Sequence, residues 1–220
     1  MARCRDGTQS MDGNHRLFNP DSGGHPLPND PREIDAVLQA TERCFDAHPY
    51  FIARYGERGR SFANSDGGYL VTLTYSWQSH VDEQVAWLAQ LLSARGMPSW
   101  LMELHLQCLH QELRRRLPEG STRFAKLRRA ATRLRKLRCS RMAQEDFDAI
   151  AAGFDAAAGP DIANVGGLLA AAVCDERGGW LEAVPSLVEW LADRERFAPR
   201  WCGAVHQALA DARASALPAV

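Results

Sequence analysis

The sequence predicts an all-α protein, an internally duplicated helical bundle in which a basic amphipathic helix joins two related repeats of about 100 residues. Three observations support this fold class. Apolar residues recur at helical spacing along most of the chain, the six tryptophans fall into pairs at nearly constant separation, and one segment between the repeats concentrates positive charge. With 220 residues, 45% of them hydrophobic, the chain is long enough to bury a sizeable core.

The first repeat is expected over residues 32–117, after an arm at residues 1–31 whose Gly, Pro and polar content predicts disorder. Pro31 suits the first turn of a helix. The residues that share one face of this helix are Ile34, Val37, Leu38, Thr41 and Phe45. Two further helices follow, one with Val81, Val85, Leu88 and Leu92, the other with Leu101, Leu104, Cys108, Leu109 and Leu113.

One stretch of the first repeat, "YLVTLTYSW" from Tyr69, contains β-branched and aromatic residues that a strand would tolerate. Its counterpart in the second repeat, "LLAAAVCD", is rich in alanine and indicates a helix. The pairing of the two stretches therefore favours a helix for both. The second repeat is expected over residues 142–214, followed by a tail at residues 215–220.

The duplication is predicted by spacing. The tryptophan pairs are Trp77 with Trp180, Trp87 with Trp190 and Trp100 with Trp201. The octets "PSWLMELH" from Pro98 and "PRWCGAVH" from Pro199 share Pro, Trp and His at the same positions, and "FDA" occurs at both Phe45 and Phe147. Two related halves usually pack about a pseudo-twofold axis, so we expect them to form one body.

The paired histidines of these octets, His105 and His206, are candidate cofactor ligands. Across a twofold axis, two imidazoles could bind the iron of haem or another tetrapyrrole. With Cys108 and Cys202 at on-face helical spacing, the four residues could also form a tetrahedral zinc site. The interpretation that the residues favour is structural: a buried ring, hydrogen-bonded to a carbonyl, that fixes the start of the helix and the packing of the tryptophan.

A second constellation occurs in the first repeat alone. Glu103 and His110 lie two turns apart on one helix face and, with His80, could form a carboxylate and imidazole metal site of a metal-dependent enzyme. The pairing Glu-x-x-His from two helices is missing, so solvated surface charge is the favoured interpretation. The phosphate-binding glycine motifs and the nucleophile motif G-x-S-x-G are also missing, which argues against an enzyme.

The linker at residues 118–141 is the main charged feature of the chain. From Arg114 to Arg141 there are 12 of the 26 Lys and Arg residues and only one acidic residue, Glu119, although the net charge of the chain is −1. An apolar stripe shows that this helix packs on something. We expect eight of its residues to bind a partner: Arg123, Lys126, Arg128, Arg129, Arg133, Arg135, Lys136 and Arg138. The alternative is that the helix neutralises the acidic body of its own chain.

The leading functional prediction is a cytoplasmic helical interaction or regulatory protein that acts through protein–protein contacts. The alternatives are a haem or metal sensor that uses His105 and His206, and the metal-dependent enzyme described above. The sequence lacks a long uncharged apolar run and an apolar leader, and its six cysteines are scattered, which favours reduced thiols and the cytoplasm. The shortage of aromatic residues within the basic segment argues against sequence-specific DNA binding.

Overall fold

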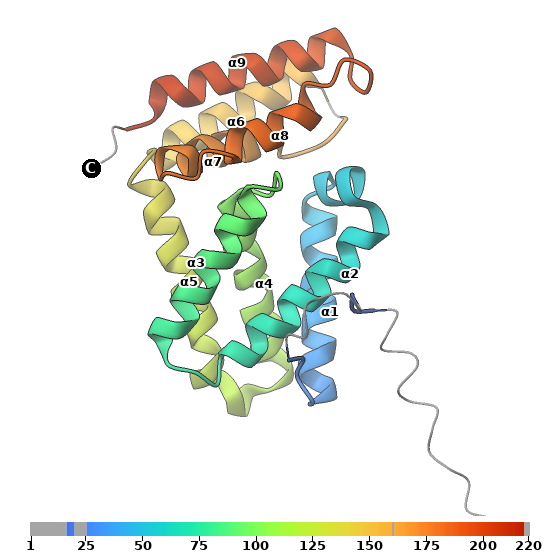
Figure 1. Ribbon diagram of the computed structural model, residues 1–220, viewed down its shortest axis with the longest axis vertical. Helices are drawn as coiled ribbons and strands as arrows, with labels where there is room; N and C mark the ends of the chain where they lie inside the picture. Colours follow the sequence, from blue (N-terminus) through green and yellow to red (C-terminus); the bar gives the residue numbers. More distant parts are fainter. Residues whose placement is uncertain (1–16, 20–25, 160, 218–220) are drawn as a thin grey trace, which may run out of the picture.

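The computed structural model describes residues 17–19, 26–159 and 161–217, and within these residues the regular structure is helical, with no strand (Figure 1). The all-α prediction is confirmed, and "YLVTLTYSW" begins as the end of a helix that runs to Leu73. Most of the arm predicted at residues 1–31 (residues 1–16 and 20–25) and residues 218–220 of the predicted tail lie outside the described residues.

The helices of the described chain form two bundles. The N-terminal bundle consists of α1 (Pro31–Ala47), α2 (Tyr50–Leu73), α3 (Gln78–Ser93), α4 (Ser99–Arg116) and α5 (Ser121–Cys139), with a short 3₁₀ turn at Pro118–Gly120. The C-terminal bundle consists of α6 (Gln144–Ala158), α7 (Val165–Arg177), α8 (Ala183–Leu191) and α9 (Pro199–Ser215). Figure 1 shows the C-terminal bundle lying crosswise over one end of the N-terminal bundle.

The N-terminal core joins all five helices of its bundle. Asp30 caps α1, because its carboxylate accepts from the backbone N–H of Arg32 at 2.9 Å, and Pro31 occupies the first turn as predicted. The predicted apolar stripe of α5 is buried in the same core, including Phe124, Leu127 and Leu134. The basic helix is therefore a packed member of the N-terminal bundle as well as the connection to the second bundle. Phe18, from the segment before α1, is also buried there.

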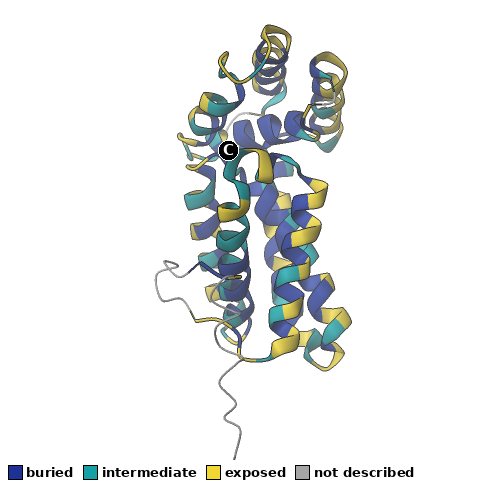
Figure 2. Ribbon diagram, turned by 90° about the vertical axis from the view of Figure 1, so that its right-hand side faces the viewer, coloured by how far each residue is buried: buried dark blue, intermediate teal, exposed yellow. Residues whose placement is uncertain are grey.

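The C-terminal core surrounds α7. Every residue of this helix from Val165 to Asp175 is buried, and its small side chains allow α6, α8 and α9 to approach closely. Trp201 on α9 is 1% exposed and donates its indole N–H to the carbonyl of Leu191 at 3.0 Å. In both bundles the buried residues follow the inward faces of the helices (Figure 2).

A buried carboxylate joins the two bundles. Asp175 on α7 accepts from the backbone N–H of Ser99 at 2.7 Å, from the Ser99 hydroxyl at 2.6 Å and from the Ser93 hydroxyl at 2.9 Å. Ser99 is the first residue of α4, so a side chain of the C-terminal bundle satisfies an N–H that would otherwise lack a partner at the start of this helix. The start of α4 is thereby fixed from outside its own bundle.

The members of each tryptophan pair lie in different surroundings. Trp100 and Trp201 both lie in the first turn of a helix, α4 and α9, yet Trp201 is fully buried and Trp100 only partly. Trp77 is 85% exposed, whereas its partner Trp180 is partly buried against both cores. The "FDA" pair falls near the end of α1 and near the start of α6. The duplication remains a prediction.

Candidate ligand site

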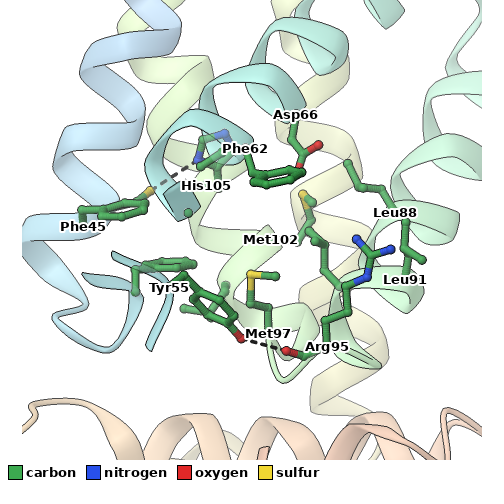
Figure 3. A pocket seen from close by; sticks show the side chains of 16 residues that line it. Phe45, Tyr55, Phe62, Asp66, Leu88, Leu91, Arg95, Met97, Met102 and His105 are labelled. Carbon is green, nitrogen blue, oxygen red and sulfur yellow. Dashed lines mark hydrogen bonds between the residues drawn. The ribbon is translucent and has the colours of Figure 1, made fainter. Parts of the chain in front are cut away.

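A cavity of about 240 Å³ lies among α1, α2, α3 and α4 of the N-terminal bundle (Figure 3). Its wall is mainly apolar. Aromatic rings come from α1 and α2, leucines from α3, and methionines from the start of α4 and the connection before it; they include Phe45, Phe51, Tyr55, Phe62, Leu88, Leu91, Met97 and Met102. Three polar groups also line it: the imidazole of His105, the carboxyl group of Asp66 and the guanidinium of Arg95.

The shape of this cavity depends on a bend in α2. Gly56 has φ 58° and ψ −157°, a conformation that L-residues rarely adopt, and it interrupts the helix after its first two turns. The bend places Tyr55 against the next turn, where a Cβ on Gly59 would lie 2.4 Å from the Cβ of Tyr55. Both glycines are therefore required for α2 to carry Phe51 and Tyr55 on one side of the cavity and Phe62 and Asp66 on the other.

His105 lies at the α4 side of the cavity and is buried. Its Nδ1 is 3.6 Å from the Sγ of Cys44, and its Nε2 has no hydrogen-bond partner. Burial lowers the pKa of His105 to about 4, so the ring is neutral at physiological pH. A buried polar atom without a partner is uncommon in folded proteins. The Nε2 atom faces Gly67 of α2 and is enclosed by its neighbours, so the ring lines the cavity without exposing this nitrogen to it.

Gly67 makes room for this ring. A Cβ at position 67 would lie 3.2 Å from Nε2 of His105 and 2.9 Å from Cγ1 of Val37. Gly67 therefore allows α2 to pass close to α1 and α4, and the ring of His105 is one of the groups that it accommodates.

Asp66 and Arg95 are the charged groups of the cavity. Within the described chain, the carboxyl group of Asp66 has no hydrogen bond or ion pair, and burial raises its pKa to about 6, an effect that the positive charge of Arg95 partly offsets. Figure 3 shows Asp66 and the guanidinium of Arg95 on separate parts of the cavity wall. The site therefore combines an apolar interior with a carboxyl group that lacks a counter-charge in direct contact.

The structure places His105 and His206 in different bundles and in different surroundings. His105 is buried in the N-terminal bundle, whereas His206 is exposed on α9 of the C-terminal bundle. Cys202 is buried on α9 with its thiol near the carbonyls of Ala192 and Phe197, and Cys108 is partly buried on α4. Over the part of the chain that the structure describes, no group of three or more His, Cys, Asp or Glu side chains could hold a metal ion.

The residues Glu103, His110 and His80 are likewise not gathered into one site. Glu103 is buried and forms an ion pair with Arg138 at 3.3 Å. His110 is buried elsewhere on α4, where burial lowers its pKa and the positive charges of Arg114 and Arg128 lower it further. His80 is exposed on α3. The carboxylate that would bind a metal is thus already engaged by a guanidinium.

The basic helix α5 directs much of its charge to its own chain. Five of the eight predicted partner-binding residues contact side chains or carbonyls of other segments: Arg123 with Glu33 and Thr74, Lys126 with the carbonyls of Thr74 and Ser76, Arg129 with Gln78, Arg133 with Asp82, and Arg138 with Glu103. The other three, Arg128, Arg135 and Lys136, are exposed. Contacts within the chain therefore account for part of the predicted binding surface.

Sequence reasoning did not identify Asp66 or Arg95. A signal for Asp66 was present, because the second repeat reads "IANVGGLL" where the first reads "FANSDGGYL", so a carboxyl group stands before the glycine pair in one copy only. Arg95 stands next to the helix-ending Gly96 and resembles an ordinary surface residue in the sequence. Its place at the cavity follows from the packing of α3 against α2 and α4.

Comparisons with known protein families, curated proteins and solved structures give no match to this chain. None of the helices in the described residues combines the length and apolarity needed to cross a membrane. Functional conclusions therefore rest on the geometry of the described residues.

Proposed function

We propose that the protein binds a small, largely apolar molecule in the cavity of its N-terminal bundle. The observation that supports this most strongly is the combination of an aromatic-lined cavity of about 240 Å³ with the carboxyl group of Asp66 on its wall, which has no ion pair among the described residues. Ligand sites in proteins are mostly apolar, with a few polar groups that fix orientation. Asp66 supplies such a group here.

The size of the cavity, about 240 Å³, indicates the size of its occupant. A cavity of about 150 Å³ holds benzene, so this one has room for a substituted benzene or a molecule of similar size.

The proposal keeps His105 from the predicted sensor only as a residue of the cavity wall. Haem or zinc ligation through both His105 and His206 stays an untested prediction. Burial keeps the ring of His105 neutral, so it adds no charge to that wall.

The test uses tert-butylbenzene as a neutral probe and thermal unfolding as the readout. We expect the probe to raise the Tm of the wild-type protein by stabilising the folded state. Ala63→Phe places a ring in the cavity wall and should abolish the shift, whereas Ala86→Phe, the same substitution at an exposed position of α3, should preserve it. An unchanged Tm in the wild type, or an equal shift in both variants, would refute binding in this cavity.

A second candidate function follows the predicted protein–protein contacts and rests on an exposed aromatic corner, defined as Tyr75 and Trp77 in the turn between α2 and α3. These side chains are 72% and 85% exposed. The guanidinium of Arg123 lies 4.0 Å from the centre of the Tyr75 ring, and the ammonium of Lys126 donates to the carbonyls of Thr74 and Ser76. The structure thus places aromatic side chains beside the basic helix.

We propose that this corner docks an acidic segment of a partner protein. Among the described residues, Lys126 and Arg129 contact only uncharged oxygens, so their charge stays available for carboxylates, and Trp77 offers a large apolar surface beside them. A fluorescein-labelled decaglutamate peptide should bind at low salt, and Trp77→Ala should weaken it about 5-fold. Trp87→Ala is the control, since Trp87 lies elsewhere, on α3. Equal affinity in both variants would refute this docking site.

A further inference from the structure

We propose that the ligand of the N-terminal cavity is an organic cation, an apolar molecule carrying an ammonium group whose charge is balanced by Asp66. This inference rests on the proposed function, because it assigns a chemical class to the ligand of the same cavity. It rests on two features of the cavity wall. One is a set of four aromatic rings, and the other is a carboxyl group beside them that forms no ion pair among the described residues.

The aromatic rings come from two adjacent segments of the chain. Phe45 lies in the last turn of α1, Phe51 and Tyr55 lie before the bend in α2, and Phe62 lies after it. Phe45 and Phe51 stack with their centres 4.9 Å apart. Aromatic faces carry negative electrostatic potential, and several rings around one space are the arrangement that proteins use to hold quaternary ammonium groups.

The carboxyl group lies directly beside these rings. Asp66 follows Phe62 by four residues, one helical turn, so the two side chains occupy the same face of α2. Figure 3 shows the carboxyl group beside the Phe62 ring at the cavity wall. Asp66 is partly buried in apolar surroundings, which costs its carboxylate hydration, and a bound cation would provide it with a partner. The charge of Asp66 thereby distinguishes cations from neutral molecules of the same shape.

Among the described residues, no cationic side chain forms an ion pair that balances the charge of Asp66. Arg95 lines the cavity but forms no ion pair with Asp66 among the described residues, and His105 is neutral. Arg60 lies 4.7 Å from the centre of the Phe45 ring, and its charge is balanced by Glu42 and Glu57. Arg54 lies 5.3 Å from the centre of the Tyr55 ring and Arg58 lies 5.5 Å from the centre of the Phe62 ring, so three of the four rings have a guanidinium of the chain near them.

The experiment compares three probes of similar size by isothermal titration calorimetry: phenyltrimethylammonium, its neutral isostere tert-butylbenzene, and benzenesulfonate as an anion. We expect the cation to bind at least about 10-fold more tightly than the neutral isostere. Asp66→Asn should reduce the affinity for the cation to that for the neutral probe while leaving tert-butylbenzene unaffected. Asp46→Asn removes an exposed carboxylate of α1 outside the cavity and should change neither affinity.

The outcomes separate this inference from the proposed function. Equal affinity for the cation and its isostere would overturn the cationic class while leaving ligand binding intact. Tightest binding of benzenesulfonate would overturn it in favour of Arg95 as the recognition group. Failure of all three probes to bind would overturn both proposals.

Discussion

His105 and His206 close the same octet pattern, yet one is buried beside a cavity and the other is exposed to solvent. The difference reflects how the two bundles are packed. In the N-terminal bundle the long, bent α2 and its aromatic side chains leave a space between helices. In the C-terminal bundle the short α7 is buried along its length by small residues such as Ala170, Ala171 and Ala172. Equal spacing along the chain thus leads to unequal chemistry, and the first bundle carries the candidate site.

The bundles are also unequal in what they provide to each other. The C-terminal bundle contributes Asp175, which fixes the start of α4, and the carbonyl of Ser186, which accepts from Arg54 at 2.8 Å. Both contacts support helices that line the cavity. We therefore regard the C-terminal bundle as a support for the N-terminal site, and the following substitutions test this view.

The largest effect is expected from Trp201→Ala in the C-terminal core. This substitution removes a fully buried indole that contacts the rings of Phe154 and Phe197, so it should lower the free energy of unfolding by about 3–5 kcal/mol. Trp77→Ala, at a position 85% exposed, should change it by less than about 0.5 kcal/mol. Urea denaturation measures both, and similar losses in the two variants would contradict the packing described.

A somewhat smaller loss is expected from Asp175→Ala at the joint between the bundles. The substitution leaves the hydroxyls of Ser93 and Ser99 and the N–H of Ser99 without their acceptor, at a cost of about 2–4 kcal/mol. Asp155→Ala, at an exposed position of α6, is the matched control. If Asp175 supports the cavity of the N-terminal bundle, the Asp175 variant should also bind tert-butylbenzene less tightly in calorimetry. An unchanged affinity would contradict this support.

Asp66→Asn should stabilise the protein in a pH-dependent way. Burial raises the pKa of Asp66 to about 6 in the folded state, so its contribution to stability is fully present below pH 3.8 and is lost as the pH rises through about 6. Arg95, whose positive charge lowers the pKa of Asp66, is present in both the wild type and the variant. The variant should therefore gain about 2 kcal/mol over the wild type above pH 6 and almost nothing below pH 4. A gain independent of pH, measured by thermal unfolding, would contradict the burial of an unpaired carboxyl group.

Two glycine substitutions, one in each bundle, should give the smallest changes in the free energy of unfolding, and these changes should have opposite signs. Gly67→Ala places a methyl group against Val37 and His105, and should destabilise the protein by about 1–2 kcal/mol. Gly153→Ala on α6 meets no atom within 4 Å and should stabilise it by about 0.5–1 kcal/mol through its higher helix propensity. Chemical denaturation of the pair measures both, and equal signs would contradict the tight passage at Gly67.

Much of the fold could be predicted from local patterns. The apolar stripe through Phe124, Leu127 and Leu134 identified the buried face of α5, and Pro31 identified the start of α1, because helix periodicity and capping act over a few residues. The surroundings of His105 could not be predicted in the same way. They depend on how side chains from α1, α2 and α4 fill the space between them, which spacing along one helix does not determine.

The site residues show the same limit. The sequence placed His105 among its candidates because of a repeated pattern, but the pattern also included His206, which the fold leaves on the surface. Asp66 lines the cavity because the bend at Gly56 places the two parts of α2 on different sides of it, which the sequence does not show. A glycine in a helix is a weak signal in a sequence, since it also occurs where a helix ends.

The most direct test of the difference between the bundles is a titration of ¹⁵N-labelled protein with tert-butylbenzene, followed by amide chemical shifts. We expect the largest shifts at residues 44–66 of α1 and α2 and at residues 88–105 of α3 and α4, which surround the cavity. Residues 144–215 of the C-terminal bundle should change little. Shifts concentrated in the C-terminal bundle, or none at saturating probe, would contradict a ligand site in the N-terminal bundle.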